Sequence, residues 1–273
     1  MRHRLAIGAV ALLAVVAIAT AATAASAAQI PPPPNIASAG KVVYCMDISF
    51  PPFGYYSPSH KPIGGEVDLA TALAKLMGVK ATFRDTQFDG IIPALQAGQC
   101  DAVISGLFDK PSRRKVVDFV DYARVGNSIV VAKGNPHHVS KLADLSGLKV
   151  AVISGSTLRQ ELVAASKKLD AAGKSPMAIQ DFPKDSDAFQ QLVAGNVDAY
   201  YTSGSAAAYY VKKTGGRVQL AGPQISALPF GIATRKDDKA LHNAFAKGLA
   251  ALKKSGQYKA ILTKWEVGNT AIK

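Results

Sequence analysis

The sequence predicts an α/β protein made of two similar lobes with a cleft between them. The main observation is a repeated frame, L-x-A-G-[QN]-x-D-A, which starts at Leu95 and again at Leu192. In both copies an apolar-periodic helix ends at a glycine, which can take the left-handed conformation, and an apolar strand follows. This order is the second half of a βαβ unit. Unless so short a frame recurs by coincidence, the repeat indicates two lobes.

The first strand of each unit lies upstream of its helix. Residues 41–46 and 149–153 are short, β-branched apolar runs without alternation. Such runs are typical of parallel strands that are buried on both faces. The second strands are expected at residues 102–105 and 199–202.

The end of the chain is expected to return to the first lobe. Residues 228–234 predict a strand, and amphipathic helices are predicted at 238–255 and 257–265, with no strand partner in the second lobe. The chain then passes between the lobes twice, near residues 122–129 and 224–231. Two crossings make a hinge suited to closure on a ligand.

The N-terminal residues 1–28 have the three parts of a secretory signal peptide. A basic start is followed by an apolar run over residues 5–19 and by the small-residue cleavage site Ala25-Ser26-Ala27. A membrane anchor would need a longer and more strongly apolar run. We therefore expect an exported, periplasmic protein.

A proline-rich tether is predicted to precede the lobes. Residues 29–40 contain four consecutive prolines, which favour a stiff polyproline segment outside the core. The remaining chain divides into lobe one, at 41–125 and 230–273, and lobe two, at 126–229.

The net charge of +13 is spread along the chain. Lysine and arginine are scattered among the acidic residues, and no run of five or more basic residues occurs. Nucleic-acid binding is therefore not expected. The histidines have no metal-ligand spacing, so neither a metal nor a cofactor is expected.

The two cysteines, Cys45 and Cys100, are expected to be buried free thiols. An oxidising compartment would let them pair. However, Cys45 lies near the end of its predicted strand and Cys100 before the start of its own. In neighbouring parallel strands this would separate their Cα atoms by more than the roughly 7 Å that a disulfide allows.

Four motifs occur in the order and spacing of a known family: Asp47-x-x-Phe50-Pro51-Pro52-Phe53, Gly65-Glu66-Val67-Asp68-Leu69-Ala70, Phe88-Asp89-Gly90-Ile91-Ile92-Pro93-Ala94-Leu95 and Arg113-x-x-x-Val117-Asp118-Phe119. Over residues 41–266 the chain resembles the bacterial extracellular solute-binding proteins of family 3, the periplasmic receptors of polar amino acid ABC transporters. The resemblance implies the two-lobed periplasmic-binding-protein fold (type II) with two crossover hinge strands. It also implies a small-molecule ligand with a carboxylate, delivery to ABC permease membrane subunits, and a monomer.

The resemblance places the α-carboxylate of the ligand at Arg113, which follows the predicted strand 105–108. A planar guanidinium can hold a carboxylate through two parallel hydrogen bonds. The alternative is a surface arginine, as expected for Arg114. In lobe two, Ser156 and Thr157 open a helix whose free N–H groups would meet the same carboxylate on closure. Ser156 also fits a simple helix cap.

Other pocket residues are expected beyond the carboxyl ends of strands, where open α/β sheets bind ligands. The family places an aromatic lid at Phe50 and a pocket wall at Phe88, although Phe88 also fits a core position. Ser105 and Gly106 are expected to line the pocket, with Ser105 offering backbone and hydroxyl groups.

Two acids of the second motif have a simpler interpretation. Glu66 and Asp68 open a helix, where acidic side chains favour the helix dipole. We expect neither of them in the site.

The chain departs from the family at Ser203 and Phe108. Ser203 stands where the family usually has an acid that receives the ligand α-ammonium, and Phe108 replaces a common small residue. A buried ammonium without a carboxylate is costly. Either another acid serves, or the ligand lacks a free amine there. The candidate acids are Asp47, Asp109 and Asp185.

Three classes of function stay open. The first is a transport receptor that closes on one ligand. The second is a secreted dehydratase-like enzyme on the same fold, which would need an acid or base in the cleft, for example Asp109 beside apolar Phe108. The third is a soluble ligand carrier for a chemosensory receptor, which would differ in its partner surfaces rather than in its pocket. No catalytic residue is assigned.

Overall fold

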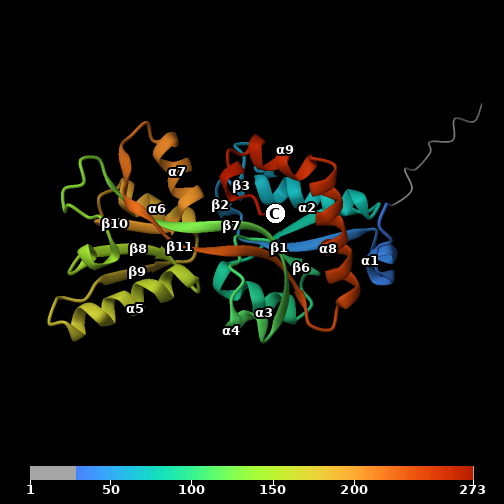
Figure 1. The fold of residues 1–273 in the computed structure, drawn as a ribbon, viewed down its shortest axis with the longest axis horizontal. Coiled ribbons are helices and arrows are strands. Elements are labelled where there is room, and N and C mark those ends of the chain that lie inside the picture. Colours follow the sequence, from blue (N-terminus) through green and yellow to red (C-terminus); the bar gives the residue numbers. More distant parts are fainter. Residues whose placement is uncertain (1–28, 273) are drawn as a thin grey trace, which may run out of the picture.

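The structure, a computed structural model, describes residues 29–272. The signal peptide predicted for residues 1–28 lies outside the described residues. A mixed eight-stranded sheet runs through the molecule, with helices on both sides of it (Figure 1). Its strands, in their order across the sheet, are β5 (Lys80–Asp85), β1 (Lys41–Met46), β6 (Ala102–Val103), β11 (Val218–Arg235), β7 (Val117–Ala132), β10 (Ala199–Ser203), β8 (Lys149–Ile153) and β9 (Ala178–Phe182).

The long antiparallel strands β7 and β11 run from one half of the molecule to the other (Figure 1). Strands β1, β5 and β6 form the sheet of lobe one, and β8, β9 and β10 that of lobe two. Lobe one carries a small sheet of β2 (Ser49–Phe50), β3 (Gly54–Tyr56) and β4 (Pro62–Ile63) and the helices α1 (Pro34–Ala39), α2 (Gly65–Leu76), α3 (Ile91–Gln96), α4 (Pro111–Arg114), α8 (Lys239–Lys254) and α9 (Gln257–Lys264). Lobe two carries α5 (Thr157–Ala171), α6 (Asp185–Val193) and α7 (Gly204–Lys213). Short 3-10 helices lie at Phe88–Gly90, Leu142–Leu145 and Gly268–Thr270.

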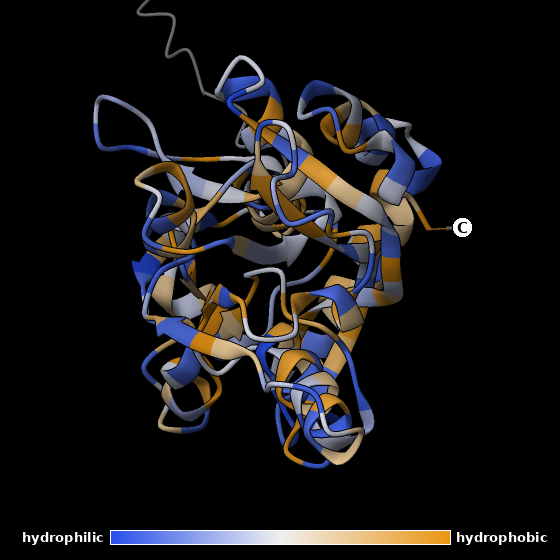
Figure 2. Cartoon of the chain, turned by 90° about the vertical axis from the view of Figure 1, so that its left-hand side faces the viewer, coloured by the Kyte–Doolittle hydropathy of each residue, from blue (hydrophilic) through white to orange (hydrophobic). Residues whose placement is uncertain are grey.

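The two-lobed α/β fold predicted from the sequence is therefore confirmed, and so is the return of the chain end to lobe one. Helices α8 and α9 pack against α2. The helices are amphipathic, with hydrophobic and hydrophilic stretches alternating along them (Figure 2). Their apolar faces cover the sheet, as the ring of Phe245 on α8 does at 5.9 Å from that of Tyr44 on β1.

The repeated sequence frame has the same structure in both lobes. Its glycine has a positive φ at both places. The backbone N–H of Asp101 donates to the carbonyl of Val43 at 2.8 Å, and its carboxylate accepts the N–H of Val43 at 2.8 Å. Asp198 makes the same two bonds with Lys149, at 2.9 and 2.8 Å. Each aspartate therefore joins the second strand of its unit to the first, which confirms the paired βαβ units.

The tether predicted for residues 29–40 is wrong. Ile30 is 8% exposed and Ile36, on helix α1, is 1% exposed, and both belong to the core of lobe one. The N–H of Ile30 also donates to the carbonyl of Leu76 at 3.0 Å. The prolines extend the chain, but the isoleucines on both sides of them bury apolar surface and hold the segment against the lobe.

The expectation of free thiols is also wrong. Cys45 and Cys100 form a disulfide, with their Cα atoms 5.7 Å apart. The prediction assumed that the two strands start side by side. Instead, Ala102 at the start of β6 pairs with Tyr44 near the end of β1. This stagger brings the chain before β6 closer to Cys45 than side-by-side strand starts would. Cys100 then lies in a bend outside the strand register, which brings its Cα to within 5.7 Å of that of Cys45.

Candidate functional site

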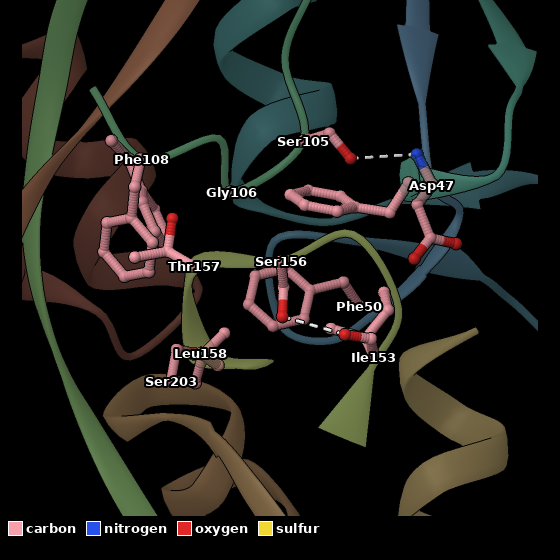
Figure 3. Close-up of a pocket in the computed structure, with 12 residues that line it drawn as sticks. Asp47, Phe50, Ser105, Gly106, Phe108, Ile153, Ser156, Thr157, Leu158 and Ser203 are labelled. Atoms are coloured by element: carbon pink, nitrogen blue, oxygen red, sulfur yellow. Dashed lines mark hydrogen bonds between the residues drawn. The ribbon is translucent and has the colours of Figure 1, made fainter. Parts of the chain in front are cut away.

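A pocket lies between the lobes. Figure 3 shows residues of lobe one facing residues of lobe two across it. The pocket is lined by Asp47, Phe50, Phe88, Ser105, Gly106, Phe108 and Phe230 from lobe one, and by Ile153, Ser156, Thr157, Leu158 and Ser203 from lobe two. Of the residues predicted for the site or offered as its acids, Arg113, Asp109 and Asp185 do not line it. The sequence analysis missed Phe230, Ile153 and Leu158, which looked like ordinary core positions.

Lobe one presents its polar wall where strands end. Asp47 follows the last residue of β1, and Ser105 and Gly106 follow β6. The N–H of Asp47 donates to the hydroxyl of Ser105 at 2.9 Å (Figure 3). The carboxyl ends of parallel strands meet at one edge of a sheet, which is why these residues gather there.

The segment 105–108 is a loop, not the predicted strand, because β6 ends at Val103. Gly106 has a φ of +56°, and a Cβ there would lie 2.6 Å from the ring of Phe50. Only glycine satisfies both conditions without strain. The loop therefore brings backbone polar groups close to the pocket.

Glu66 holds this loop from behind. Its carboxylate accepts a hydrogen bond from the N–H of Gly106 at 2.6 Å and another from the hydroxyl of Tyr122 on β7. Glu66 is 1% exposed, and burial raises its pKa to about 7. It lies outside the pocket wall, as expected, but it supports that wall. In the sequence, Glu66 is recognisable only as an acid in the first turn of a helix, and this position does not predict that it supports the pocket loop.

Aromatic rings form the apolar walls. The ring centroids of Phe108 and Phe230 are 4.6 Å apart, and that of Phe50 lies 6.3 Å from Phe230. Phe88 lines the pocket and also packs in the core, so both interpretations of it hold. These walls favour a ligand with an apolar or aromatic body.

Lobe two presents the beginnings of two helices. The hydroxyl of Ser156 accepts the N–H of Arg159 at 3.0 Å and donates to the carbonyl of Ile153 at 2.8 Å, so Ser156 does cap α5. The hydroxyl of Ser203 caps α7 by accepting the N–H of Ala206 at 3.2 Å. Within the described residues, the hydroxyl of buried Thr157 has no hydrogen-bond partner. The helix starts give this side of the pocket a positive potential.

Arg113 is buried beside the pocket without a counter-ion. It is 8% exposed, and within residues 29–272 it forms no salt bridge. It donates to the carbonyl of Phe108 at 2.9 Å, and its guanidinium lies 5.7 Å from the centre of the Phe88 ring. Burial lowers its pKa to about 10. The surface alternative is wrong for Arg113 but holds for Arg114, whose side chain is 55% exposed and pairs with Asp109.

Of the three candidate acids, only Asp47 lines the pocket. Asp109 is bound by Arg114, and Asp185 accepts hydrogen bonds from the hydroxyls of Tyr200 and Thr202. Asp47 is 1% exposed, and its Oδ2 atom has no hydrogen-bond partner in the part of the chain that the structure describes. Burial, with a smaller contribution from the charge of Asp185, raises the pKa of Asp47 to about 7.

Two other kinds of site have no counterpart in the described part of the chain. Within residues 29–272, no group of three or more His, Cys, Asp or Glu side chains is placed to hold a metal ion. No helix among these residues has the length and apolar character needed to cross a membrane.

Comparison with known proteins places the chain in a family. The family model of the bacterial extracellular solute-binding proteins, family 3, matches residues 42–269. The L-cystine-binding protein TcyJ of Escherichia coli (strain K12) is 29% identical over 232 residues, which are 85% of this chain and 84% of TcyJ. An ancestral arginine-binding protein bound to arginine has a TM-score of 0.77 and 41% identity, covering 83% of this chain and 98% of its own. The ancestral amino acid-binding protein AncCDT-1, a precursor of cyclohexadienyl dehydratase, has a TM-score of 0.77 and 36% identity. The match covers 85% of this chain and 97% of AncCDT-1. This chain therefore belongs to the bacterial extracellular solute-binding proteins of family 3.

Proposed function

We propose that this protein is the periplasmic substrate-binding protein of an ABC importer. It binds a small carboxylate-bearing solute, an amino acid or an amino-acid derivative, in the interlobe pocket and delivers it to the membrane permease. The observation that supports a ligand carboxylate is the position of Arg113 beside the pocket. Its guanidinium is buried and, within residues 29–272, has no counter-ion. An uncompensated buried charge is costly, and a ligand carboxylate would offset that cost.

The carboxylate would lie between Arg113 and the start of α5. The unpartnered hydroxyl of Thr157 and the first N–H groups of this helix supply donors from lobe two. Arg113 touches two wall residues, Phe88 and Phe108, without itself lining the pocket. A shift of the Phe88 ring would therefore bring the guanidinium into contact with the ligand.

The other end of the ligand would face Asp47. With Ser203 in place of an acid, Asp47 is the carboxylate left in the wall to receive a free ammonium. A desamino or N-substituted acid with an apolar body would instead rely on the rings. Both ligand types fit the carboxylate proposal, and they differ only in whether the amine contributes.

A thermal-shift panel tests the ligand class. L-Arginine, L-cystine, L-phenylalanine and 3-phenylpropanoate all carry a carboxylate, whereas phenethylamine carries only the amine. We expect at least one of the acids to raise the unfolding midpoint and phenethylamine to leave it unchanged. A ligand at a hundred times its dissociation constant stabilises the folded state by about 2.7 kcal/mol. Binding of phenethylamine as strong as that of L-phenylalanine would rule out carboxylate recognition.

Calorimetry with the acid that gives the largest shift tests Arg113. Arg113→Ala is expected to weaken its binding about a hundredfold or more, and Arg113→Lys to bind poorly, because a point charge does not reproduce the planar fork. Arg114→Ala is the matched control and should keep the wild-type affinity. Wild-type affinity in Arg113→Lys would make Arg113 a structural residue.

Export and assembly belong to the same proposal. The signal-like residues 1–28 would direct the chain to the periplasm, where cell fractionation should find the processed protein. Light scattering after size-exclusion chromatography should show a monomer.

A dehydratase is the second candidate, and one observation favours it. Asp47 is a pocket carboxyl with a pKa of about 7, which suits a general acid. Asp109, the acid that the sequence suggested for this role, does not line the pocket. Incubation with a hydroxylated cyclohexadienyl carboxylic acid, whose hydroxyl can leave as water once it is protonated, followed by mass spectrometry, decides between the enzyme and the receptor. Catalytic loss of water that Asp47→Asn abolishes would establish the enzyme, and recovery of intact acid would favour the receptor.

A further inference from the structure

We infer that Ser49 is a positioning residue that couples the pocket carboxylate Asp47 to closure of the two lobes. The inference rests on the proposed function, in which the lobes close on a ligand. Ser49 belongs to β2 in lobe one and is 6% exposed. Its hydroxyl donates to Asp47 Oδ1 at 2.8 Å and accepts the N–H of Asp185, the first residue of α6 in lobe two, at 3.0 Å. One buried hydroxyl thus bonds both lobes.

The two bonds are part of a longer buried chain. On the side of lobe one, the N–H of Asp47 donates to the hydroxyl of Ser105 in the pocket wall. On the side of lobe two, the Asp185 carboxylate accepts hydroxyl hydrogen bonds from Tyr200 and Thr202 on β10. Polar contacts therefore continue from the pocket wall, through the interface, to strand β10 of lobe two.

Other polar contacts between the lobes are more exposed. Lys184 and Asp85 pair at 3.4 Å with partly exposed side chains, and Lys212 and Glu266 pair at 2.6 Å with both side chains about two-thirds exposed. Exposed ion pairs contribute little net free energy. The buried bond through Ser49 is stronger because water competes less for it.

The same geometry makes closure depend on charge. The closed arrangement contains two buried carboxylates, and among residues 29–272 Oδ2 of both Asp47 and Asp185 has no hydrogen-bond partner. Burial raises the pKa of both groups to about 7. For Asp47 the hydrogen bond from Ser49 opposes this shift, the charges of Asp185 and Asp85 add to it, and the charge of Lys184 opposes it. The hydroxyls of Tyr200, Thr202 and Tyr210 oppose the shift of Asp185. Neutralising one carboxylate, by a proton or by a ligand ammonium, therefore favours the closed state.

The direction of the pH effect is set by linkage. The closed state binds protons more tightly than an open state with solvated carboxylates, because its carboxyl pKa values are raised. Closure of the ligand-free protein is therefore favoured at pH 5 and disfavoured at pH 8. Without the Ser49 hydroxyl, no hydrogen bonds link Asp47 to Asp185 across the two lobes. The pH dependence of closure should then disappear.

Small-angle scattering of the ligand-free mature protein at pH 5 and pH 8 tests this. The wild type is expected to have the smaller radius of gyration at pH 5. Ser49→Ala should be expanded at both pH values, and Ser49→Thr, which keeps the hydroxyl, should restore the dependence. Ser186→Ala is the matched control, because this neighbour of Asp185 bonds only Asp187, at 3.5 Å. Asp185→Asn, which removes one charge, should be compact at both pH values.

Two results would overturn the inference. One is a wild-type radius of gyration that does not change between the two pH values. The other is a Ser49→Ala profile equal to that of the wild type. Neither result involves Arg113, so the carboxylate proposal would stand on its own calorimetry.

Discussion

The two lobes contain the same repeated unit, but they contribute opposite chemistry to the pocket. In lobe one, β6 is two residues long and leads into the loop that carries Ser105, Gly106 and Phe108. In lobe two, β10 is five residues long and leads directly into α7, which Ser203 caps. Lobe one therefore supplies a carboxylate and aromatic rings, whereas lobe two supplies helix starts. The segment after the second strand, rather than the repeat itself, decides the chemistry of each side.

The lobes also differ in how their repeats are secured. Cys100 in the first frame is linked to Cys45, and the corresponding residue of the second frame is the buried Val197. At this position the first unit is thus held covalently and the second by apolar packing.

Removing the covalent link is expected to have the largest effect on stability. The cysteines are 55 residues apart, and loop-closure entropy for that length predicts that the Cys45→Ala, Cys100→Ala double variant loses about 4 kcal/mol of unfolding free energy. Val197→Ala, the matched change in lobe two, should lose about 1–2 kcal/mol. Urea denaturation measures both. A double variant no less stable than Val197→Ala would mean that the disulfide adds nothing.

The paired aspartates should behave alike. Asp101→Ala and Asp198→Ala each remove a carboxylate that accepts one backbone N–H at 2.8 Å. Each is expected to cost about 1–3 kcal/mol, as for hydrogen bonds to charged groups. Urea denaturation of the two variants should agree within error. A much larger loss at one position would break the equivalence of the two units.

Buried Glu66 makes the stability of lobe one depend on pH. Its folded pKa is raised to about 7, so the folded state holds a proton that the unfolded chain has released above about pH 4.5. The free energy of unfolding should therefore fall as pH rises from 5 to 8. Glu66→Gln should flatten this slope in urea titrations. An unchanged slope would assign the effect to Asp47 and Asp185.

The smallest expected effect is a change in selectivity at Ser203. Ser203→Asp keeps a side chain that can cap α7 and adds a carboxylate to the wall of lobe two. The affinity ratio of L-phenylalanine to 3-phenylpropanoate is expected to rise about tenfold, because the added charge attracts only the amine. Calorimetry of both compounds measures the ratio. A ratio that stays the same would show that the ligand amine does not reach Ser203.

Much of the fold could be predicted from local patterns in the sequence. The repeat, the buried apolar strands and the amphipathic helices of the chain end are all confirmed. Register was out of reach, because the stagger of β6 against β1 depends on packing between distant segments; this led to the error at Cys45 and Cys100. The tether was misjudged because four prolines outweighed two isoleucines whose partners lie far along the chain.

The site was predictable where a residue lies at the end of a strand or the start of a helix. Asp47, Ser105 and Ser156 are of this kind, and all three line the pocket. Their role in binding stays a prediction until a ligand is measured. Phe230 and the supporting role of Glu66 could not be found, because only long-range contacts bring Phe230 into the pocket wall and Glu66 behind it. The pairing of Arg114, rather than Arg113, with Asp109 is likewise visible only in three dimensions.

The disulfide has a consequence for proteolysis. The segment that it encloses contains Asp47, Phe50, Glu66 and Phe88. It also contains the exposed turn around Ser59 and His60, a suitable place for a protease to cut. A single cut there would leave both fragments covalently joined through Cys45 and Cys100. Such a nicked protein would separate into two chains only after reduction, and its lobe-one pocket residues would remain attached to the rest of the molecule.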